Sequence, residues 1–213
     1  MLRQQLLDTS RGRIVTLLRR GGLTADDIAA ELKLTTSAVR VQLAAMERDG
    51  VVLRVGQRPG TTRPSQVFAL TPEVEQLLSQ AYVPLLSQFV RVFTQELPTE
   101  AVNDLMRQAG RGLADELLGG TRPSGGLKAR VALVSRLMNE QLGAVTNVEG
   151  NGHIVIRGAG CPVAALTGKH PAVCVAMESF VAEVVGAPTR ECCDRSGRPR
   201  CCFEVRAAAD DTT

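Results

Sequence analysis

Apolar side chains in the first third of the chain recur at helical spacing in three short blocks, which predict three helices. Their apolar positions are Ile14, Leu17 and Leu18; Ile28 and Leu32; and Val39, Leu43 and Met46. Thr24 and Thr35 are N-cap residues for the second and third blocks, and Gly21 and Gly50 end the first and third. Two capped helices across a turn at 33–34 predict a helix-turn-helix.

Two β-rich runs follow, VVLRVGQ and SQVFAL, and the polar loop RPGTTRP between them predicts a hairpin. Three helices and a hairpin are the order of a winged helix, whose third helix enters the DNA major groove while the wing contacts backbone or minor groove. The candidate DNA-contacting residues are Thr36, Ser37, Arg40, Val41, Gln42, Arg54, Arg58 and Arg63. We expect Arg40 and Gln42 to contact base edges, because guanidinium and amide groups make bidentate hydrogen bonds there.

The middle of the chain has a helical apolar stripe that begins at Pro72 and continues for about 20 residues, with a kink expected at Pro84. So much apolar surface needs a partner. One candidate is the next helix of the same chain, over 102–117, and another is a second copy across a two-fold axis that would pair with a pseudo-palindromic operator. Both arrangements are compatible. The glycine-rich stretch at 119–126 has the composition of a linker.

The last third alternates helices and hairpins. Helices are predicted over 127–142 and 171–185, and Asn151–Gly152 between β-prone runs signals a hairpin. A second hairpin surrounds DRSGRPR, with Cys193 opposite Cys201 and Cys192 opposite Cys202. Because side chains alternate along a strand, Cys201 shares the face of Phe203 and should point inward, while the choice between Cys192 and Cys193 stays open.

Charge is distributed unevenly along the 213 residues. The first 72 residues carry 11 Lys and Arg against 6 Asp and Glu, a net +5, whereas the remainder carries 14 against 16, a net −2. The basic third supports contact with DNA. No signal peptide, membrane span, nucleophile elbow, P-loop or dinucleotide fingerprint is recognisable, so we expect a cytoplasmic protein that is neither an enzyme nor bound to a membrane.

All six cysteines lie within 42 residues, from Cys161 to Cys202. In a reducing cytosol such a group indicates metal-binding or redox chemistry more than a disulfide framework. Cysteine-only ligation suits zinc and iron–sulfur clusters alike, although the Cys-x2-Cys pair common in zinc sites is absent from the sequence. Buried inert cysteines would explain one or two of the six. His170 is a further possible ligand, but a surface role is more common for such a histidine.

The chain resembles the SufR-like iron–sulfur regulators of the wider ArsR/DeoR winged-helix group in three tracts. These tracts are SAVRVQLAAMERDGVV, RPGTTRPSQVFALT, and CPVAALTGKHPAVC followed by CCFEV. The resemblance spans nearly the whole chain. It implies a homodimer that represses genes while it holds a [4Fe–4S] cluster and leaves DNA when the cluster is lost. Cys161, Cys174 and Cys201 match the motif by position. We take Cys193 as the fourth ligand, with Cys192 or Cys202 as alternatives.

The sequence therefore predicts a mainly helical α+β protein in four parts. These are a winged helix-turn-helix at 1–72, a helical dimerisation connector at 73–126, a cysteine-containing α+β sensor domain at 127–207 and a disordered tail at 208–213. The expected function is a homodimeric repressor of double-stranded DNA operators, switched by an iron–sulfur cluster. The alternatives are thiol/disulfide or zinc sensing, with zinc or no cofactor in place of the cluster, and sensing of a small apolar effector.

Overall fold

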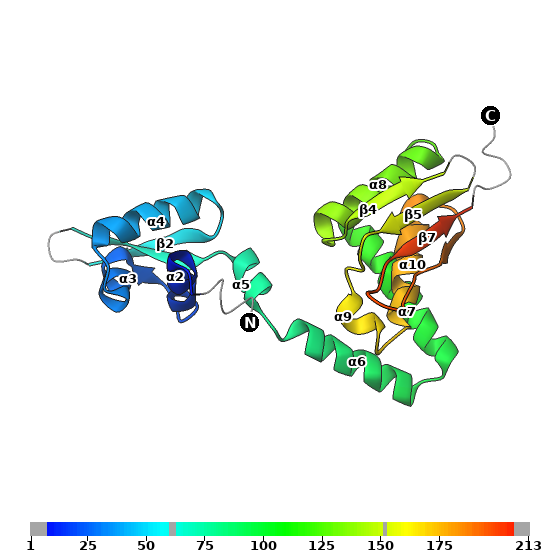
Figure 1. The fold of residues 1–213 in the computed structure, drawn as a ribbon, viewed down its shortest axis with the longest axis horizontal. Helices are drawn as coiled ribbons and strands as arrows, with labels where there is room; N and C mark the ends of the chain where they lie inside the picture. Colours follow the sequence, from blue (N-terminus) through cyan, green and yellow to red (C-terminus); the bar gives the residue numbers. More distant parts are fainter. Residues whose placement is uncertain (1–7, 60–62, 151–152, 207–213) are drawn as a thin grey trace. The chain divides into compact units, whose positions relative to one another are not determined.

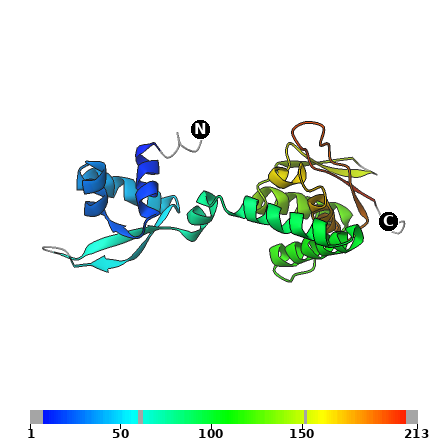
Figure 2. The same ribbon diagram turned by 90° about the horizontal axis from the view of Figure 1, so that it is seen from below.

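The structure is a computed structural model that describes residues 8–59, 63–150 and 153–206. Its contacts divide the chain into an N-terminal unit, Met1–Gln80, and a C-terminal unit, Ala81–Thr213. Each unit has buried apolar clusters of its own. Figures 1 and 2 show the elements of each unit in two perpendicular views.

The described part of the N-terminal unit combines four helices with a three-stranded antiparallel sheet of order β1-β3-β2. Its elements are α2 (Ser10–Leu18), β1 (Leu23–Thr24), α3 (Ala25–Leu32), α4 (Thr36–Arg48), β2 (Val52–Arg58), β3 (Ser65–Leu70) and α5 (Pro72–Leu78). Strands β2 and β3 form the wing. The winged-helix order predicted from the sequence is confirmed (Figure 1).

Local capping explains where the first three helices begin. Thr9, Thr24 and Thr35 each accept a hydrogen bond at the side-chain hydroxyl from the backbone N–H three residues further on. At Thr24 the arrangement is reciprocal, because the Asp27 carboxylate accepts from the Thr24 backbone N–H at 2.8 Å. Lys33 ends α3 in the left-handed conformation with φ 56°, which turns the chain toward α4.

The segment predicted as one long helix kinked at Pro84 is two helices. Helix α5 ends at Leu78, and the next helix begins at Tyr82, so Pro84 lies in a first turn and does not kink a continuous helix. A first-turn proline sacrifices no hydrogen bond, whereas within a longer helix its ring would clash with the carbonyl four residues earlier. Val74 and Leu78 pack α5 against the N-terminal core.

The C-terminal unit packs helices against a four-stranded antiparallel sheet of order β4-β5-β7-β6 (Figure 1). Its elements are α6 (Tyr82–Glu96), α7 (Thr99–Leu118), α8 (Leu127–Gln141), β4 (Thr146–Glu149), β5 (Ile154–Gly158), α9 (Ala164–Thr167), α10 (Val173–Val185), β6 (Thr189–Glu191) and β7 (Cys202–Val205). Phe180 and Phe203 are at the centre of its larger core, 0% and 1% exposed. The short helix α9 was not predicted.

The predicted connector over 73–126 is not a separate body. Helix α5 lies in the N-terminal unit, while α7 packs along α10 in the C-terminal unit. Ala114 of α7 and Val131 of α8 belong to the same core cluster, so the loop 119–126 joins two helices of one core. Glycine composition alone does not distinguish such a loop from an interdomain linker. The tail expected at 208–213 lies outside the described residues.

Both hairpins predicted in the last third are present. β4 pairs with β5 in antiparallel register, although Asn151 and Gly152 lie outside the described residues. In the second hairpin Glu191 pairs with Phe203, and the Cys192 N–H donates to the Cys202 carbonyl at 2.8 Å. This is the predicted register, and Cys201 is only 2% exposed, as its expected inward orientation requires.

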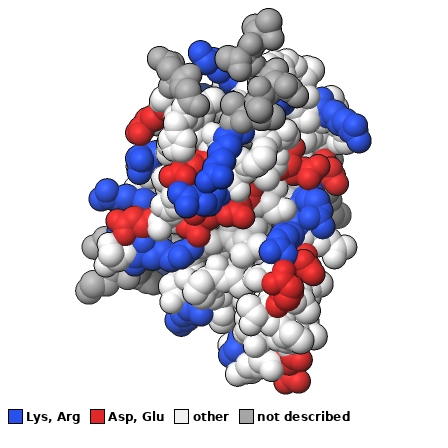
Figure 3. Space-filling model, turned by 90° about the vertical axis from the view of Figure 1, so that its right-hand side faces the viewer, with Lys and Arg blue, Asp and Glu red and all other residues white. Residues whose placement is uncertain are grey.

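No helix in the described ranges is both long and apolar enough to span a membrane. On the face drawn in Figure 3, basic and acidic side chains are interspersed.

Candidate DNA interface and cysteine site

Helix α4 buries one face in the N-terminal core and exposes the other. Val39 is fully buried, whereas Val41 is 70% exposed, and Ser37 and Arg40 are exposed as well. An exposed apolar residue between polar ones suits a helix that meets DNA, because a valine can contact the thymine methyl group in the major groove. Three of the five candidate residues on this helix therefore face solvent.

The other two candidates on α4 are placed differently. The Thr36 hydroxyl donates to Asp26 Oδ1 at 2.9 Å, which ties the start of α4 to α3. Gln42 is half-buried. At 3.6 residues per turn, it stands about 200° around the helix from Arg40. Arg40 and Gln42 are therefore on opposite flanks of the exposed face, although they are only two residues apart in the sequence.

A groove of about 630 Å³ lies between α4 and the wing. Arg40 and Glu47 line it from α4, Arg54 from β2, and Arg63 from the residues before β3. Neither Arg40 nor Arg63 has an ion pair within the described ranges. These two guanidinium groups are available for an anionic ligand.

Two contacts fix the exposed Arg54 side chain on the protein surface. Its Nη2 donates to Glu47 Oε2 at 2.9 Å, and its guanidinium lies 5.9 Å from the centre of the Phe68 ring. Part of its charge is therefore already balanced by α4. A phosphate would have to compete with Glu47 for this arginine.

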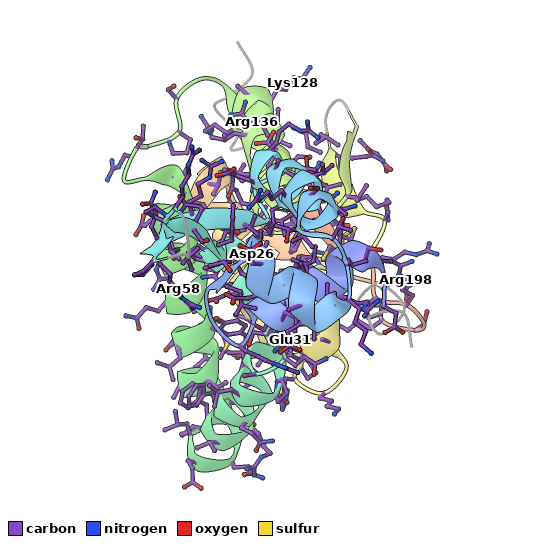
Figure 4. All side chains as sticks on the ribbon, turned by 90° about the vertical axis from the view of Figure 1, so that its left-hand side faces the viewer. Asp26, Glu31, Arg58, Lys128, Arg136 and Arg198 are labelled. Carbon is purple, nitrogen blue, oxygen red and sulfur yellow. A yellow bond between two sulfur atoms is a disulfide. The ribbon has the colours of Figure 1, made fainter. Side chains whose placement is uncertain are left out.

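Arg58 anchors the wing to α3, a role that the sequence analysis did not identify. Its guanidinium donates to Asp27 Oδ2 at 3.2 Å and to the Gly22 carbonyl at 2.6 Å. The pKa of Asp27 is lowered, first by the Thr24 backbone hydrogen bond and, to a smaller degree, by the positive charge of Arg58. Figure 4 labels Arg58 together with Asp26 and Glu31 of α3.

The six cysteines fall into two groups. Cys192 and Cys202 are joined by a disulfide across the β6–β7 hairpin, with their Cα atoms 4.9 Å apart. The other four are free thiols and line one cavity: Cys161, Cys174, Cys193 and Cys201. Strand alternation separates the groups, because neighbouring residues on a strand face opposite sides of the hairpin.

Three elements bring the four free thiols together. Cys161 lies in the loop after β5, Cys174 in the first turn of α10, and the other two on the hairpin next to the disulfide. Met177 and Phe203 close the apolar side of the cavity, and Arg195 lines it as well. The backbone N–H of Cys202 donates to Cys193 Sγ at 3.2 Å. Cys193, the candidate fourth ligand, thus lines the same cavity as the other three free thiols, and His170 does not line it.

The thiols have different acidities. A hydrogen bond from Cys201 lowers the pKa of Cys161 to about 6, although burial acts in the opposite sense, and the Val163 N–H and Thr167 hydroxyl add to the lowering. The same pairing raises the pKa of Cys201. At neutral pH Cys161 is therefore a thiolate and Cys201 its thiol donor.

Arg195 and Glu191 place charges beside the cavity. Burial raises the pKa of Cys174, partly offset by the Arg195 guanidinium, which donates a hydrogen bond to this thiol. Arg195 also pairs with Glu191 at 2.6 Å. Burial acts to raise the pKa of Glu191, but hydrogen bonds from Cys193 and Arg195 together lower it.

Thr167 contributes a buried hydroxyl that the sequence analysis did not single out. The residue is 2% exposed, and its hydroxyl oxygen has no conventional hydrogen-bond partner within the described residues. It lies close enough to Cys161 to lower the pKa of that thiol. Among the residues that the structure describes, no three His, Cys, Asp or Glu side chains are already arranged to hold a metal ion.

Comparisons with known proteins bear on the N-terminal unit. Residues 8–53 match the family model described as "Bacterial regulatory protein, arsR family". No curated protein matches the sequence significantly. An apo mutant of Lactococcus lactis ZitR is 16% identical with a TM-score of 0.26, over 44% of this chain and 85% of that chain. Bacillus subtilis PadR in complex with operator DNA is 17% identical with a TM-score of 0.30, over 83% of this chain and 93% of that chain.

The matched residues include α3 and α4 and end in β2. Helix α4 carries Arg40, and β2 is the first strand of the basic wing. The matched family is one of regulators, not of enzymes. The N-terminal unit thus holds a DNA-binding helix-turn-helix that is similar, over residues 8–53, to that of ArsR-family transcriptional regulators.

Proposed function

We propose that this protein is a homodimeric repressor whose operator binding is switched by an iron–sulfur cluster held by Cys161, Cys174, Cys193 and Cys201. The observation that carries the proposal is the convergence of these four free thiols on one cavity, while the remaining two cysteines pair with each other. Cysteine thiolates are the usual ligands of such clusters.

The surroundings of the four thiols suit a thiolate-ligated group. Cys161 is already ionised at neutral pH, so no proton has to be removed from it before ligation. The Arg195 guanidinium offsets negative charge at the cavity, and the Thr167 hydroxyl, which lowers the pKa of Cys161, is a hydrogen-bond donor to sulfur. When bound, a cluster would supply a redox-sensitive link between the loop after β5, α10 and the hairpin.

The dimer is proposed to form along α6. This helix exposes a stripe of large apolar side chains at helical spacing: Tyr82, Val83, Leu85, Leu86, Phe89, Val92 and Phe93. The stripe contains no charged residue, and Arg91 beside it is hydrogen bonded to Gln88 and Gln95. Two copies of this face can pair without repulsion between like charges. A second copy also supplies the second recognition helix that a pseudo-palindromic operator requires.

The cysteine segment and α6 are in direct contact, which offers a route for the switch. Leu166 of α9 and Val173 of α10 pack with Val90 on the buried side of α6. Residues 161–174 therefore lie between the thiol cavity and the helix that carries the dimer face. Fixing Cys161 and Cys174 by ligation would fix this segment and bias the position of α6.

Anaerobic purification followed by iron, sulfide and zinc analysis and a visible spectrum tests the proposal. We expect a coloured protein with about four irons per chain that binds its operator more tightly than the cluster-free form. Cys161→Ser and Cys201→Ser should lose the iron. Cys192→Ser keeps all four cavity thiols and should therefore hold more iron than either of these two variants. Colourless protein with stoichiometric zinc would overturn the proposal.

A thiol switch without a cluster is the second candidate. The thiolate of Cys161 beside the thiol of Cys201 favours it, because such a pair is poised for oxidation to a disulfide. Titration of free thiols before and after mild peroxide separates the two candidates. A cluster-free switch loses thiols in pairs without any bleaching of visible absorbance. Analytical ultracentrifugation of Phe89→Glu against the wild type tests the dimer, since a buried carboxylate on α6 should give monomers.

A further inference from the structure

The disulfide between Cys192 and Cys202 lies on the face of the β6–β7 hairpin opposite the thiol cavity. Its neighbours on that face are polar, because Arg190 and Glu204, two residues away along each strand, form an ion pair. The two cysteines therefore cannot be ligands of the cavity while they are bonded to each other. They form a second sulfur centre that the proposed function does not use.

This bond closes the part of the hairpin that carries two of the cavity thiols. Cys193 and Cys201 are the first and last residues inside the loop that the disulfide closes. Without the disulfide, the register of this part of the hairpin depends on three backbone hydrogen bonds. One joins Cys192 to Cys202, and two join Asp194 to Arg200. Strand β6 has only three residues and lies at the sheet edge, so it pairs with β7 alone.

One residue of the disulfide also contacts a cavity sulfur through its backbone. The backbone N–H of Cys202 donates to Cys193 Sγ at 3.2 Å, so the strand that carries one half of the disulfide also positions the fourth thiol. Opening the 192–202 bond would allow Cys193 and Cys201 to move apart, since the loop between them gains conformational freedom.

We propose that Cys192 and Cys202 are a reversible dithiol–disulfide pair, separate from the cavity, and that its oxidation holds Cys193 and Cys201 in position to bind a thiophilic metal or cluster. A hydroperoxide is the oxidant. The Cys192 thiolate attacks the peroxide oxygen, giving a sulfenic acid and releasing an alcohol or water. The Cys202 thiol then attacks that sulfur and releases water, so two thiols and one hydroperoxide give one disulfide. A dithiol reverses the reaction by thiol–disulfide exchange.

Thiol counting on the full-length, cluster-free protein tests the pair itself. The reduced chain has six thiols, and stoichiometric hydrogen peroxide should leave four. Trypsin should then release the peptide ECCDR cross-linked to CCFEVR, with fragmentation assigning the bond to 192 and 202. Cys193→Ser, the neighbouring control on the opposite face, should still lose two thiols, whereas Cys192→Ser and Cys202→Ser should lose none at this dose. A cross-link that includes Cys161 or joins 193 to 201 would overturn the proposal.

The effect on the cavity is tested with Cd²⁺ as the probe, followed by its thiolate absorbance. Oxidised wild type should bind Cd²⁺ about tenfold more tightly than the reduced protein or Cys192→Ser, although it has fewer thiols. Equal affinities would refute the link between the pair and the cavity. The inference assumes that the cavity binds a thiophilic group, as in the proposed function, but neither assay needs iron or DNA. Colourless protein would therefore overturn the cluster proposal but not the proposal of a reversible disulfide. An unreactive 192–202 pair would overturn the reversible disulfide but not the cluster proposal.

Discussion

The Nε2 atom of His170 lies 2.8 Å from the hydroxyl oxygen of Ser87. This hydrogen bond joins the segment between Cys161 and Cys174 to α6, beside the packing of Val90 with α9. His170, which the sequence suggested as a possible metal ligand, instead ties the cysteine segment to the proposed dimer helix.

Removing this bond should loosen the segment after α9. In Ser87→Ala, amide hydrogen exchange over 164–173 should be about three- to tenfold faster, because one partly buried hydrogen bond contributes about 1 kcal/mol. Gln88→Ala, an exposed neighbour whose side chain contacts Arg91, is the control and should leave exchange in that segment unchanged. Equal exchange in both variants would mean that the bond does not hold the segment.

Arg40 should contribute to base recognition. Arg40→Ala is expected to lower affinity for the operator by roughly 5- to 150-fold, with less effect on unrelated DNA, because bidentate contacts to base edges distinguish sequences. Arg63→Ala should weaken binding to all sequences and reduce the slope of log affinity against log salt by about 1. Fluorescence anisotropy over a salt series measures both quantities. An operator preference unchanged in Arg40→Ala would contradict the assignment.

The acidity of Cys161 gives a pH dependence with a defined sign. Alkylation of this thiol in cluster-free protein should rise with a midpoint near pH 6, the pKa of its folded form. Because this pKa lies below the value of 9.0 for an unperturbed thiol, ionisation of Cys161 stabilises the fold increasingly as pH rises from about 6 to about 9. The contribution is lost as pH falls toward 6.

Thr167→Val tests the origin of that acidity. Loss of the hydroxyl should move the alkylation midpoint to higher pH, since one of the groups that lowers the Cys161 pKa is removed. Valine is similar in volume, so the fold should persist. Thr189→Val, in which a threonine on β6 bonded to the Ala187 carbonyl is changed, should leave the midpoint in place.

Gly110 permits the close packing of α7 on α10. A Cβ atom there would collide with the backbone carbonyl of Ala176, whereas one at Gly112 would meet open space. Gly110→Ala should therefore destabilise the C-terminal unit by about 1–3 kcal/mol, while Gly112→Ala should be neutral or stabilising by up to about 1 kcal/mol through helix propensity. Urea denaturation of the two variants makes the comparison. Equal stabilities would argue against close contact between the helices.

Local patterns in the sequence sufficed for most elements and for one register. Threonine caps and apolar spacing act within a few residues, so the helices of the N-terminal unit were predictable, and the predicted hairpin register correctly placed Cys192 opposite Cys202. The disulfide between these two cysteines was not predicted. The break before Pro84 and the short helix α9 were missed. The ion pair between Arg58 and Asp27 was also missed, because no sequence feature reveals a partner so distant along the chain.

The sequence by itself therefore determined the winged helix, the basic character of the first third and the confinement of the cysteines to the last, because composition and short-range periodicity carry that information. Only the tertiary structure decided which cysteines meet. The loop after β5, the start of α10 and the β6–β7 hairpin are distant in sequence and converge through packing around Phe203 and Met177. That packing places four thiols together with Thr167 and Arg195 around one cavity. Cys192 and Cys202 form a disulfide on the opposite face of the hairpin.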